Sequence, residues 1–486
     1  MAGKLAEFEP IFFPKTHAVI GASNSPTKFG GRFIKVQMSF GYKGTFFPVN
    51  PDESEIFGMK AYPSVRDIPE PVDLATILIP APAVPQVLEE CLQKGVKAAQ
   101  IITAGFSERD EDGVRLEKEI ASIAARGIRV IGPNCFGIYC PRGGLTIPPG
   151  ESLPKDSGPV AFLSQSGGYG VRVPRRGDGL GIRYSKLVSY GNAVDVNECD
   201  LLEYLGEDPE TKIITTYTEG VKNGRRFFEL LKKVSREKPV IIWKGGLTEG
   251  GARAVKSHTA SLSGQAQVWE ALFKQTGAIA VGNIDELTDM TVGFYYLPPI
   301  KGRKFCVVGG GGGIGVAAAD ACEKAGINLP VFSRELQQKL LRIVPAQGAS
   351  VRNPVDVGSP FPNPQMLKAV LETVLTESGV DGIIVSEIEM SGWAKQSGQD
   401  WMRAEMLKQN QQVPVDVRNR FGKPVIMVLP VEGNGPEFAE AETARRQVAD
   451  FYLKQNIPVF ASLERAALTL SRFVGYWQNR EAISKQ

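Results

Sequence analysis

Only two histidines occur in the 486 residues, and one of them, His258, lies in the hydroxyl-rich segment "VKSHTASLSG". A neutral imidazole nitrogen is a good nucleophile toward phosphorus when a carboxylate holds the other ring nitrogen in the correct tautomer. Glu219 is the candidate carboxylate, because it directly follows the apolar run "KIITTYT" earlier in the same part of the chain. The two residues together predict a phosphohistidine site.

A lone histidine is more often a surface residue or a satisfied core residue, and the residues alone leave that interpretation open. Ser257 and Thr259 flank His258 and could bond an anion. The glycines before the histidine predict a loop that can move. These glycines are Gly245, Gly246, Gly250 and Gly251.

The segment "SQSGGYG" is a second candidate for phosphate chemistry. It lies where an apolar run gives way to a helical-looking segment, so backbone N–H groups and the positive end of a helix dipole could hold a phosphate there. A simple helix cap is an equally good interpretation of this stretch alone. The candidate phosphate-binding residues are Ser164, Gln165, Ser166, Gly167 and Gly168.

A run of five glycines, Gly309–Gly313, lacks the Lys-Ser/Thr of a Walker loop, and G-x-x-x-x-G-K-[ST] occurs nowhere in the sequence. We therefore expect no P-loop in this chain.

Parallel sheets with helices on both faces must position these residues. Short runs rich in β-branched residues alternate with helical-looking segments throughout, which is typical of the α/β class. The length suggests about three domains, and Pro/Gly/Lys-rich stretches separate three units, each with five such runs. We expect domains at residues 1–147, 156–297 and 302–486.

The second and third units share landmarks in the same order. "VAFLSQSGGYGV" pairs with "FCVVGGGGGIGV", "NAVDV" with "NPVDV", and "KPVIIW" with "KPVIMV". The matches indicate a duplicated flavodoxin-like unit, although any two five-stranded α/β domains look somewhat alike. The third unit has "LPVEGNGPE" where the second has the histidine segment, so the fold itself does not require the histidine.

Ligands of open parallel sheets bind beyond the carboxyl ends of the strands. In the first unit these ends carry apolar and amide groups, which suit an adenine nucleotide with a long pantetheine arm, and Gly21 allows close backbone approach. The candidate CoA-binding residues are Gly21, Ala22, Ser23, Lys28, Val49, Asn50, Pro51, Ile79, Pro80, Ala81, Thr103, Ala104, Gly105, Asn134 and Cys135.

NAD is the alternative ligand of such a sheet. The second strand ends in Asn50 and Pro51 rather than in an acid for the ribose hydroxyls. Asp52 and Glu53 lie close enough to leave this interpretation open, but no hydride-transfer site can be named.

The composition argues against several classes of protein. The net charge is +3 and the charges are dispersed, so no nucleic-acid groove is indicated. No apolar run approaches the roughly 18 residues of a membrane span, and the first residues lack a signal-peptide pattern, so we expect a cytoplasmic protein. Six scattered cysteines without C-x-x-C predict free thiols, and with two distant histidines they predict no metal site.

Taken together, the motifs resemble the α subunit of the NDP-forming (ADP-forming) acyl-CoA synthetases of the succinyl-CoA synthetase superfamily. The resemblance rests on "VIGAS", "GPNC", "SQSGG", "SYGN", "TEGVKNGRRF" and "KSHTASLSG". It implies a CoA-binding Rossmann-like domain followed by two flavodoxin-like domains. It also implies that His258 is phosphorylated, that Glu219 steadies it, and that Gln165–Gly168 cradle the phosphate.

The resemblance further implies interconversion of acyl-CoA, ADP and phosphate with a carboxylic acid, CoA and ATP, through acyl phosphate and phosphohistidine. ADP or ATP with Mg²⁺ would bind an ATP-grasp domain, for which the three units leave no segment. Either a separate β subunit supplies that domain, in an α2β2 heterotetramer, or this chain carries out only the CoA and acyl-phosphate chemistry. Some relatives place a lysine near the CoA phosphates where this sequence has the acids of "VNPDES". The contact with the CoA phosphates would then fall to Lys28. A non-catalytic CoA- or nucleotide-binding regulatory protein is the competing interpretation, and the sequence does not reveal the acid.

Overall fold

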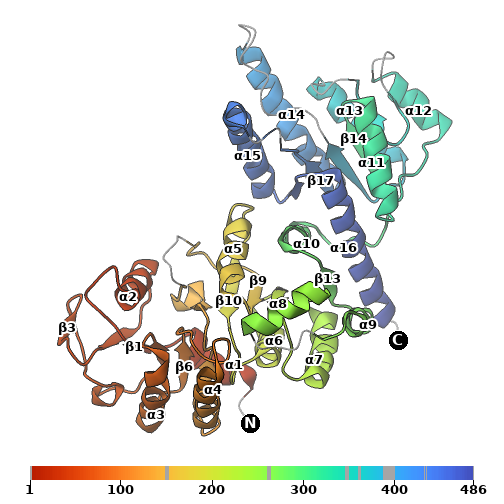
Figure 1. Ribbon diagram of the computed structural model, residues 1–486. Coiled ribbons are helices and arrows are strands. Elements are labelled where there is room, and N and C mark those ends of the chain that lie inside the picture. The colour runs from red at the N-terminus through yellow and green to blue at the C-terminus, as the bar shows by residue number, and fades with distance from the viewer. Residues whose placement is uncertain are drawn as a thin grey trace. The chain divides into compact units, whose positions relative to one another are not determined.

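The structure is a computed structural model that describes residues 3–147, 153–259, 264–344, 350–358, 363–386, 400–431, 433 and 435–484. The chain forms two compact units, Met1–Leu287 and Thr288–Gln486, which run from red to green and from green to blue in Figure 1. Within the described residues, no helix is long and apolar enough to cross a membrane. The three expected domain ranges stay predictions.

The first sheet lies in the first unit and is wholly parallel. Its strands are apolar and mostly buried, as expected for a sheet covered on both faces. The strand order is β2-β1-β5-β6-β7. The strands are β1 (Thr16–Ile20), β2 (Thr45–Val49), β5 (Leu74–Ile77), β6 (Ala98–Ile101) and β7 (Arg129–Ile131), and the helices between them are α2 (Phe29–Phe40), α3 (Val84–Lys94) and α4 (Glu111–Ala124).

The second sheet also lies in the first unit, in the order β13-β12-β11-β9-β10-β8. Its strands are β8 (Gly137–Tyr139), β9 (Val160–Ser164), β10 (Tyr184–Ser189), β11 (Ile213–Thr218), β12 (Val240–Lys244) and β13 (Ile279–Val281). Only β8 pairs antiparallel in this sheet, at its edge. The helices are α5 (Gly167–Asp178), α6 (Glu198–Glu207), α7 (Gly224–Glu237), α8 (Glu249–Thr259) and α9 (Ala266–Thr276), and the next helix, α10 (Ile284–Tyr296), spans the boundary between the two units.

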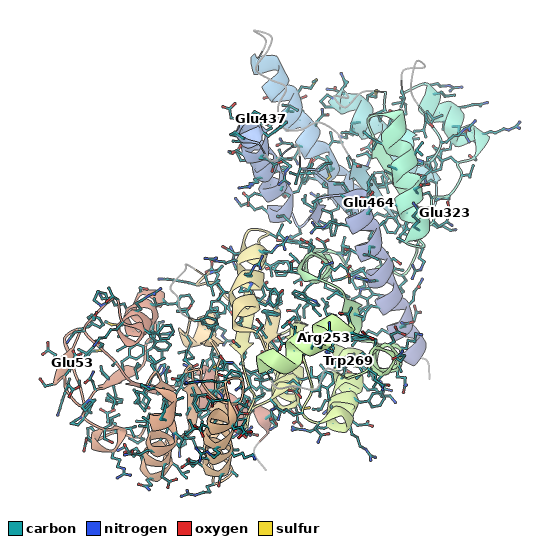
Figure 2. The ribbon with its side chains drawn as sticks, in the orientation of Figure 1. Glu53, Arg253, Trp269, Glu323, Glu437 and Glu464 are labelled. Atoms are coloured by element: carbon teal, nitrogen blue, oxygen red, sulfur yellow. The ribbon has the colours of Figure 1, made fainter. Side chains whose placement is uncertain are left out.

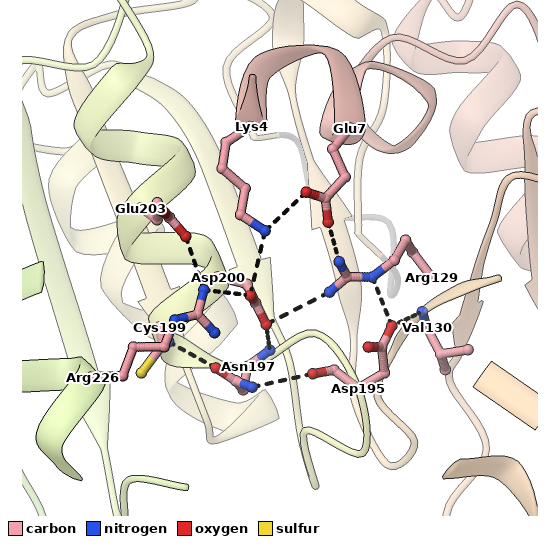
Figure 3. Close-up of polar contacts among 10 residues, drawn as sticks. All are labelled: Lys4, Glu7, Arg129, Val130, Asp195, Asn197, Cys199, Asp200, Glu203 and Arg226. Carbon is pink, nitrogen blue, oxygen red and sulfur yellow. Dashed lines mark hydrogen bonds and ion pairs between the residues drawn. The ribbon is translucent and has the colours of Figure 1, made fainter. Parts of the chain in front are cut away.

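The first helix, α1 (Lys4–Phe12), joins the two sheets of this unit. Phe8 and Phe12 stack on Tyr204 of α6, with ring centres 5.1 and 4.7 Å apart. Arg129 of β7 binds Glu7 of α1 and lies 2.9 Å from the carboxylate of Asp195, as Figure 3 shows. Apolar and charged contacts thus tie both sheets to one short helix.

The second unit contains the third sheet, in the order β15-β14-β16-β17-β18. Its strands are β14 (Phe305–Gly309), β15 (Val355–Asp356), β16 (Gly382–Ser386), β17 (Val425–Val428) and β18 (Val459–Phe460). Its helices are α11 (Gly312–Lys324), α12 (Arg334–Leu341), α13 (Pro364–Glu377), α14 (Asp400–Phe421), α15 (Ala439–Lys454) and α16 (Leu463–Ser484).

Every expected strand is present, which confirms the α/β class of parallel sheets. In chain order, the five parallel strands of each sheet are arranged 2-1-3-4-5, the flavodoxin-like order. Because the first sheet has this order too, strand order alone does not single out a duplication of the second and third units. The sequence did not predict β8 or the short hairpin of β3 (Glu55–Ile56) and β4 (Met59–Lys60).

Candidate active site

A cavity of about 630 Å³ lies where the carboxyl edge of the first sheet meets the start of α5. Its wall combines strand ends of the CoA-candidate sheet with the candidate phosphate turn. The lining residues are Phe29, Leu78, Ile79, Pro80, Ile102, Thr103, Ala104, Asn134, Cys135, Phe136, Gln165, Ser166, Gly167 and Gly168. Two sets of residues predicted separately from the sequence therefore share one cavity.

Four lining residues were not predicted: Phe29, Leu78, Ile102 and Phe136. All are apolar residues at a strand end or a helix start, where an apolar side chain usually belongs to the core. A strand presents successive side chains to opposite faces. The sequence therefore did not distinguish cavity lining from core at these positions.

The remaining CoA candidates lie outside the cavity lining, namely Gly21, Ala22, Ser23, Lys28, Val49, Asn50, Pro51, Ala81 and Gly105. Most follow strand ends along the same edge. Gly21 has φ +87°, and a Cβ there would lie 2.8 Å from the carbonyl oxygen of Leu78, so only glycine fits without strain. The Asn50 side chain donates to the Ala22 carbonyl at 2.8 Å and fastens the first loop to the second strand.

Glu53, labelled in Figure 2, is one of the two acids, with Asp52, that follow the second strand, where a NAD-binding sheet holds the ribose. One oxygen accepts hydrogen bonds from the backbone and side-chain nitrogens of Asn24, at 3.2 and 2.6 Å. The other accepts from the Ser23 hydroxyl at 3.3 Å. These bonds hold the loop after β1 in place and argue against a role for Glu53 in ribose binding.

The candidate phosphate turn has the geometry of a helix start open to an anion. Ser166 is the N-cap of α5 and accepts from the Tyr169 N–H at 3.5 Å. Ser164 is fully buried and donates to the Ser166 carbonyl at 2.6 Å, so it shapes the turn from beneath. The first N–H groups of a helix have no intrahelical acceptor and attract negative charge. A Cβ on Gly167 would lie 2.3 Å from the Phe136 ring, which explains the glycine.

Glu219 is buried directly after β11 and is fastened to this turn. The side-chain oxygen of Gln165 accepts from the backbone N–H groups of Glu219 and Gly220, at 2.7 and 3.1 Å. The Tyr217 hydroxyl donates to the Glu219 carboxylate at 3.1 Å. Burial and the Glu219 carboxylate raise the pKa of Tyr217, so the phenol keeps the proton that it donates. The structure thus brings together the glutamate and the turn.

His258 lies in the last turn of α8, and its side chain is outside the part of the chain that the structure describes. The expected loop of four glycines is half correct: Gly245 and Gly246 lie in the loop after β12, but Gly250 and Gly251 lie in the first turn of α8. The Thr248 hydroxyl accepts from the Gly251 N–H at 3.1 Å, and this cap starts the helix despite the glycines. In the sequence, the glycines indicate a loop more strongly than Thr248 indicates a helix cap.

Asn192 of the "SYGN" segment fixes the loop after β6 that lines the cavity. Its side-chain nitrogen donates to Glu108 at 2.7 Å and to Glu117 at 2.8 Å, and its oxygen accepts from Asn134 at 3.3 Å. Burial would raise the pKa of Glu108. Hydrogen bonds from Asn192 and from the backbone N–H groups of the loop outweigh burial and lower that pKa.

Cys135 is the only cysteine among the cavity-lining residues described. Burial raises its pKa to about 12, and its thiol donates to the Ile101 carbonyl at 3.3 Å. A thiol held in this form is a weak nucleophile.

Comparisons with known proteins agree with this geometry. Residues 15–141 match the family described as CoA binding domain, and residues 157–294 match the succinyl-CoA ligase like flavodoxin domain. The α subunit of acetate–CoA ligase [ADP-forming] II from Pyrococcus furiosus is 44% identical over 348 residues, 71% of this chain and 75% of that one. A trans-feruloyl-CoA synthase from an unknown prokaryotic organism is 27% identical over 473 residues, 96% of this chain and 64% of that one.

A solved structure extends the likeness to nearly the whole chain. The dinucleotide-forming acetyl-coenzyme A synthetase 1 of Ca. Korarchaeum cryptofilum, in complex with phosphate and ADP, superposes with a TM-score of 0.81. The two sequences are 33% identical, and the match covers 98% of each chain. With a CoA-binding sheet, a flavodoxin-like ligase sheet and a cavity where the two meet, this chain belongs to the family of ADP-forming acid–CoA ligase α subunits.

Proposed function

We propose that this α subunit carries the acyl-CoA chemistry in the cavity at the start of α5 and phosphorylates its own His258. The main support for the proposal is the cavity wall, in which CoA-candidate residues such as Thr103 and Asn134 lie beside the Gln165–Gly168 turn. A thioester bound along the first sheet would meet a phosphate held at the helix start.

The first step joins phosphate to the acyl group. A phosphate oxygen attacks the thioester carbonyl, the carbon–sulfur bond breaks, and CoA leaves as the thiolate. The open N–H groups of Gly167 and Gly168 would hold the phosphate in line for attack. The largely apolar wall, with Phe29 and Phe136, excludes water that would hydrolyse the acyl phosphate.

The second step moves the phosphoryl group. The lone pair of a neutral His258 ring nitrogen attacks phosphorus, the bond from phosphorus to the acyl oxygen breaks, and the carboxylate leaves. The Glu219 carboxylate would accept the hydrogen bond of the other ring N–H and stabilise the positive charge that develops on the ring. The bonds from Gln165 and Tyr217 hold Glu219 ready for this role.

The third step passes the phosphoryl group to ADP with Mg²⁺. We propose that an ATP-grasp β subunit binds this nucleotide, in an α2β2 assembly, since relatives of this chain are named α subunits. We further propose that the protein is cytoplasmic. A regulatory protein that binds CoA without catalysis is the alternative.

Protein labelling tests the proposal. The purified chain would be incubated with labelled phosphate and acetyl-, 4-hydroxybutyryl- or feruloyl-CoA, the acyl groups that the names of relatives suggest. We expect base-stable, acid-labile label on the wild type and none on His258→Ala. Label that persists in His258→Ala, or CoA binding without label for every thioester, would overturn the proposal. The second result would favour the regulatory alternative.

A further inference from the structure

A buried lysine, Lys244, contacts the backbone of Glu219, and it directly precedes the segment that leads to His258. It ends β12, and its register partner on the neighbouring parallel strand is Thr218, the residue before Glu219. The Gly245 N–H donates to the Thr218 carbonyl at 2.9 Å. The chain therefore leaves β11 toward Glu219 and leaves β12 toward His258 at the same point of the sheet edge.

The ammonium of Lys244 contacts three segments at once. It donates a hydrogen bond to the Glu219 carbonyl at 2.9 Å and another to the Gly245 carbonyl. It also lies 5.3 Å from the centre of the Trp269 ring, within the range of a cation–π contact. Trp269, labelled in Figure 2, belongs to α9, the helix that follows the histidine segment.

These contacts hold both ends of the segment that carries His258. Gly245 is the residue by which the chain enters the segment, and Trp269 lies in the first turn of the helix that it joins on leaving. The entry is further confined, because a Cβ on Gly245 would lie 2.8 Å from the Tyr217 hydroxyl. A single side chain thus fixes the two ends of the segment relative to the Glu219 loop.

Filling the core does not require a lysine at this position. Methionine has a similar volume and carries no charge, whereas burying an ammonium is costly unless it is well partnered. Burial lowers the pKa of Lys244 to about 8, and the nearby Glu219 carboxylate partly offsets the shift. The contacts that offset the cost of burying the ammonium are those with Glu219, with Gly245 and with Trp269 of α9.

We propose that Lys244 is a positioning residue for histidine phosphorylation: it sets the entry and the exit of the His258 segment against the Glu219 loop. The inference rests on the proposed function. It assigns no contact of Lys244 with phosphate or substrate. Its loss should therefore slow transfer to the histidine and leave formation of acyl phosphate nearly intact.

The test measures both steps in single turnovers of the full chain with acyl-CoA and labelled phosphate. Release of the CoA thiol reports acyl phosphate formation, and bound label reports the phosphohistidine. In Lys244→Met, we expect labelling to slow about 100-fold, because a displacement of the reacting groups by about 1 Å can slow a reaction by that factor. The rate of thiol release should change by less than about threefold. Lys244→Arg, which keeps the charge and the donors, should restore part of the labelling rate.

Lys238, the C-cap of α7 just before the opposite end of β12, offers a matched control. Its side chain also donates to two backbone carbonyls, those of Leu205 and Asp208, each at 2.7 Å. Lys238→Met loses the same kind of bonds far from the histidine segment, so it should lower the melting temperature without changing the ratio of the two rates. Should Lys244→Met fail to fold, Trp269→Leu removes the ring contact with Lys244 and leaves the two hydrogen bonds of the ammonium in place. It also removes the packing of the ring against Phe227 and Phe273, so its melting temperature is measured beside the labelling rate, which should slow selectively and by a smaller factor.

The outcomes separate the two proposals. Absence of label in the wild type would overturn the proposed function and the role of Lys244 with it. Label on the wild type that forms equally fast in Lys244→Met and Trp269→Leu would overturn only the positioning role. Equal slowing of thiol release and labelling would also overturn it, because a general loss of structure would then explain the result.

Discussion

The side-chain oxygen of Gln165 lies 2.7 Å from the backbone nitrogen of Glu219 and accepts its hydrogen bond. Gln165 opens the turn at the start of α5, and Glu219 follows the neighbouring strand β11. The bond makes the position of the glutamate depend on the turn that faces the cavity. In the proposed mechanism, this one amide would couple the placement of the phosphate to the orientation of the histidine.

Gln165→Met should uncouple the position of Glu219 from the turn at the start of α5. The change keeps the side-chain length but leaves the N–H groups of Glu219 and Gly220 without their acceptor, which costs about 1–3 kcal/mol for each buried group. We expect labelling of the protein to slow about 100-fold. Single-turnover labelling and thermal melting would be measured together. A normal labelling rate would show that the turn does not govern Glu219.

Gly167→Ala should distort the cavity. The added methyl group would lie 2.3 Å from the Phe136 ring, an overpacking that costs about 1–3 kcal/mol. We expect a lower melting temperature and weaker binding of acyl-CoA by calorimetry. Gly168→Ala is the stability control, because its methyl group meets only the Ser166 hydroxyl, at 3.9 Å. Phe136→Leu should relieve the clash in the double variant, so additive losses would contradict the steric explanation.

Lys186→Met should destabilise the first unit. Lys186 is 1% exposed and pairs with Asp208 at 2.8 Å and with Glu210 at 3.1 Å. Removing it leaves the buried Asp208 carboxylate without its ion-pair partner and Glu210 with only Arg142, at 3.8 Å, a loss of about 3–5 kcal/mol in the free energy of unfolding. Denaturant titration would measure the loss. Lys212→Met, at an exposed lysine of the same sheet, should change that free energy little.

Asn192→Ala should change how stability depends on acid pH. Despite burial, the hydrogen bonds of Asn192 and the loop hold the pKa of Glu108 below its usual value. This carboxylate therefore contributes stability that is full above its unfolded pKa of about 4.3 and is lost as pH falls through the folded pKa. The variant should be less stable at neutral pH and approach the wild type in acid. Unfolding curves that stay equally separated at every pH would contradict this linkage.

Much of the fold could be predicted from the sequence, because each long strand is an apolar run closed by Gly, Pro, Ser or Asn. The exceptions are informative. The strand β8 has three residues and pairs with β10, far along the chain, so no local pattern marks it. Gly250 and Gly251 looked like a loop, but the Thr248 cap places them in a helix.

The candidate site was only partly predictable, for a related reason. Polar and glycine residues such as Asn134 and Gly167 are conspicuous at strand ends. Phe136 and the buried ammonium of Lys244 gain their significance from contacts across elements. Such contacts depend on which strand ends become neighbours in the fold. The spacing of residues along the sequence does not reveal this.

The stacking of Phe12 on Tyr204 also constrains how the chain folds during synthesis. Tyr204 is synthesised roughly 190 residues after Phe12. At about 5–20 residues per second, that interval is on the order of ten seconds or more. The packing of α1 is thus completed late, after the strands of the first sheet have emerged. A nascent chain stalled before α6 would present Phe8 and Phe12 to chaperones instead of to their native partner, Tyr204.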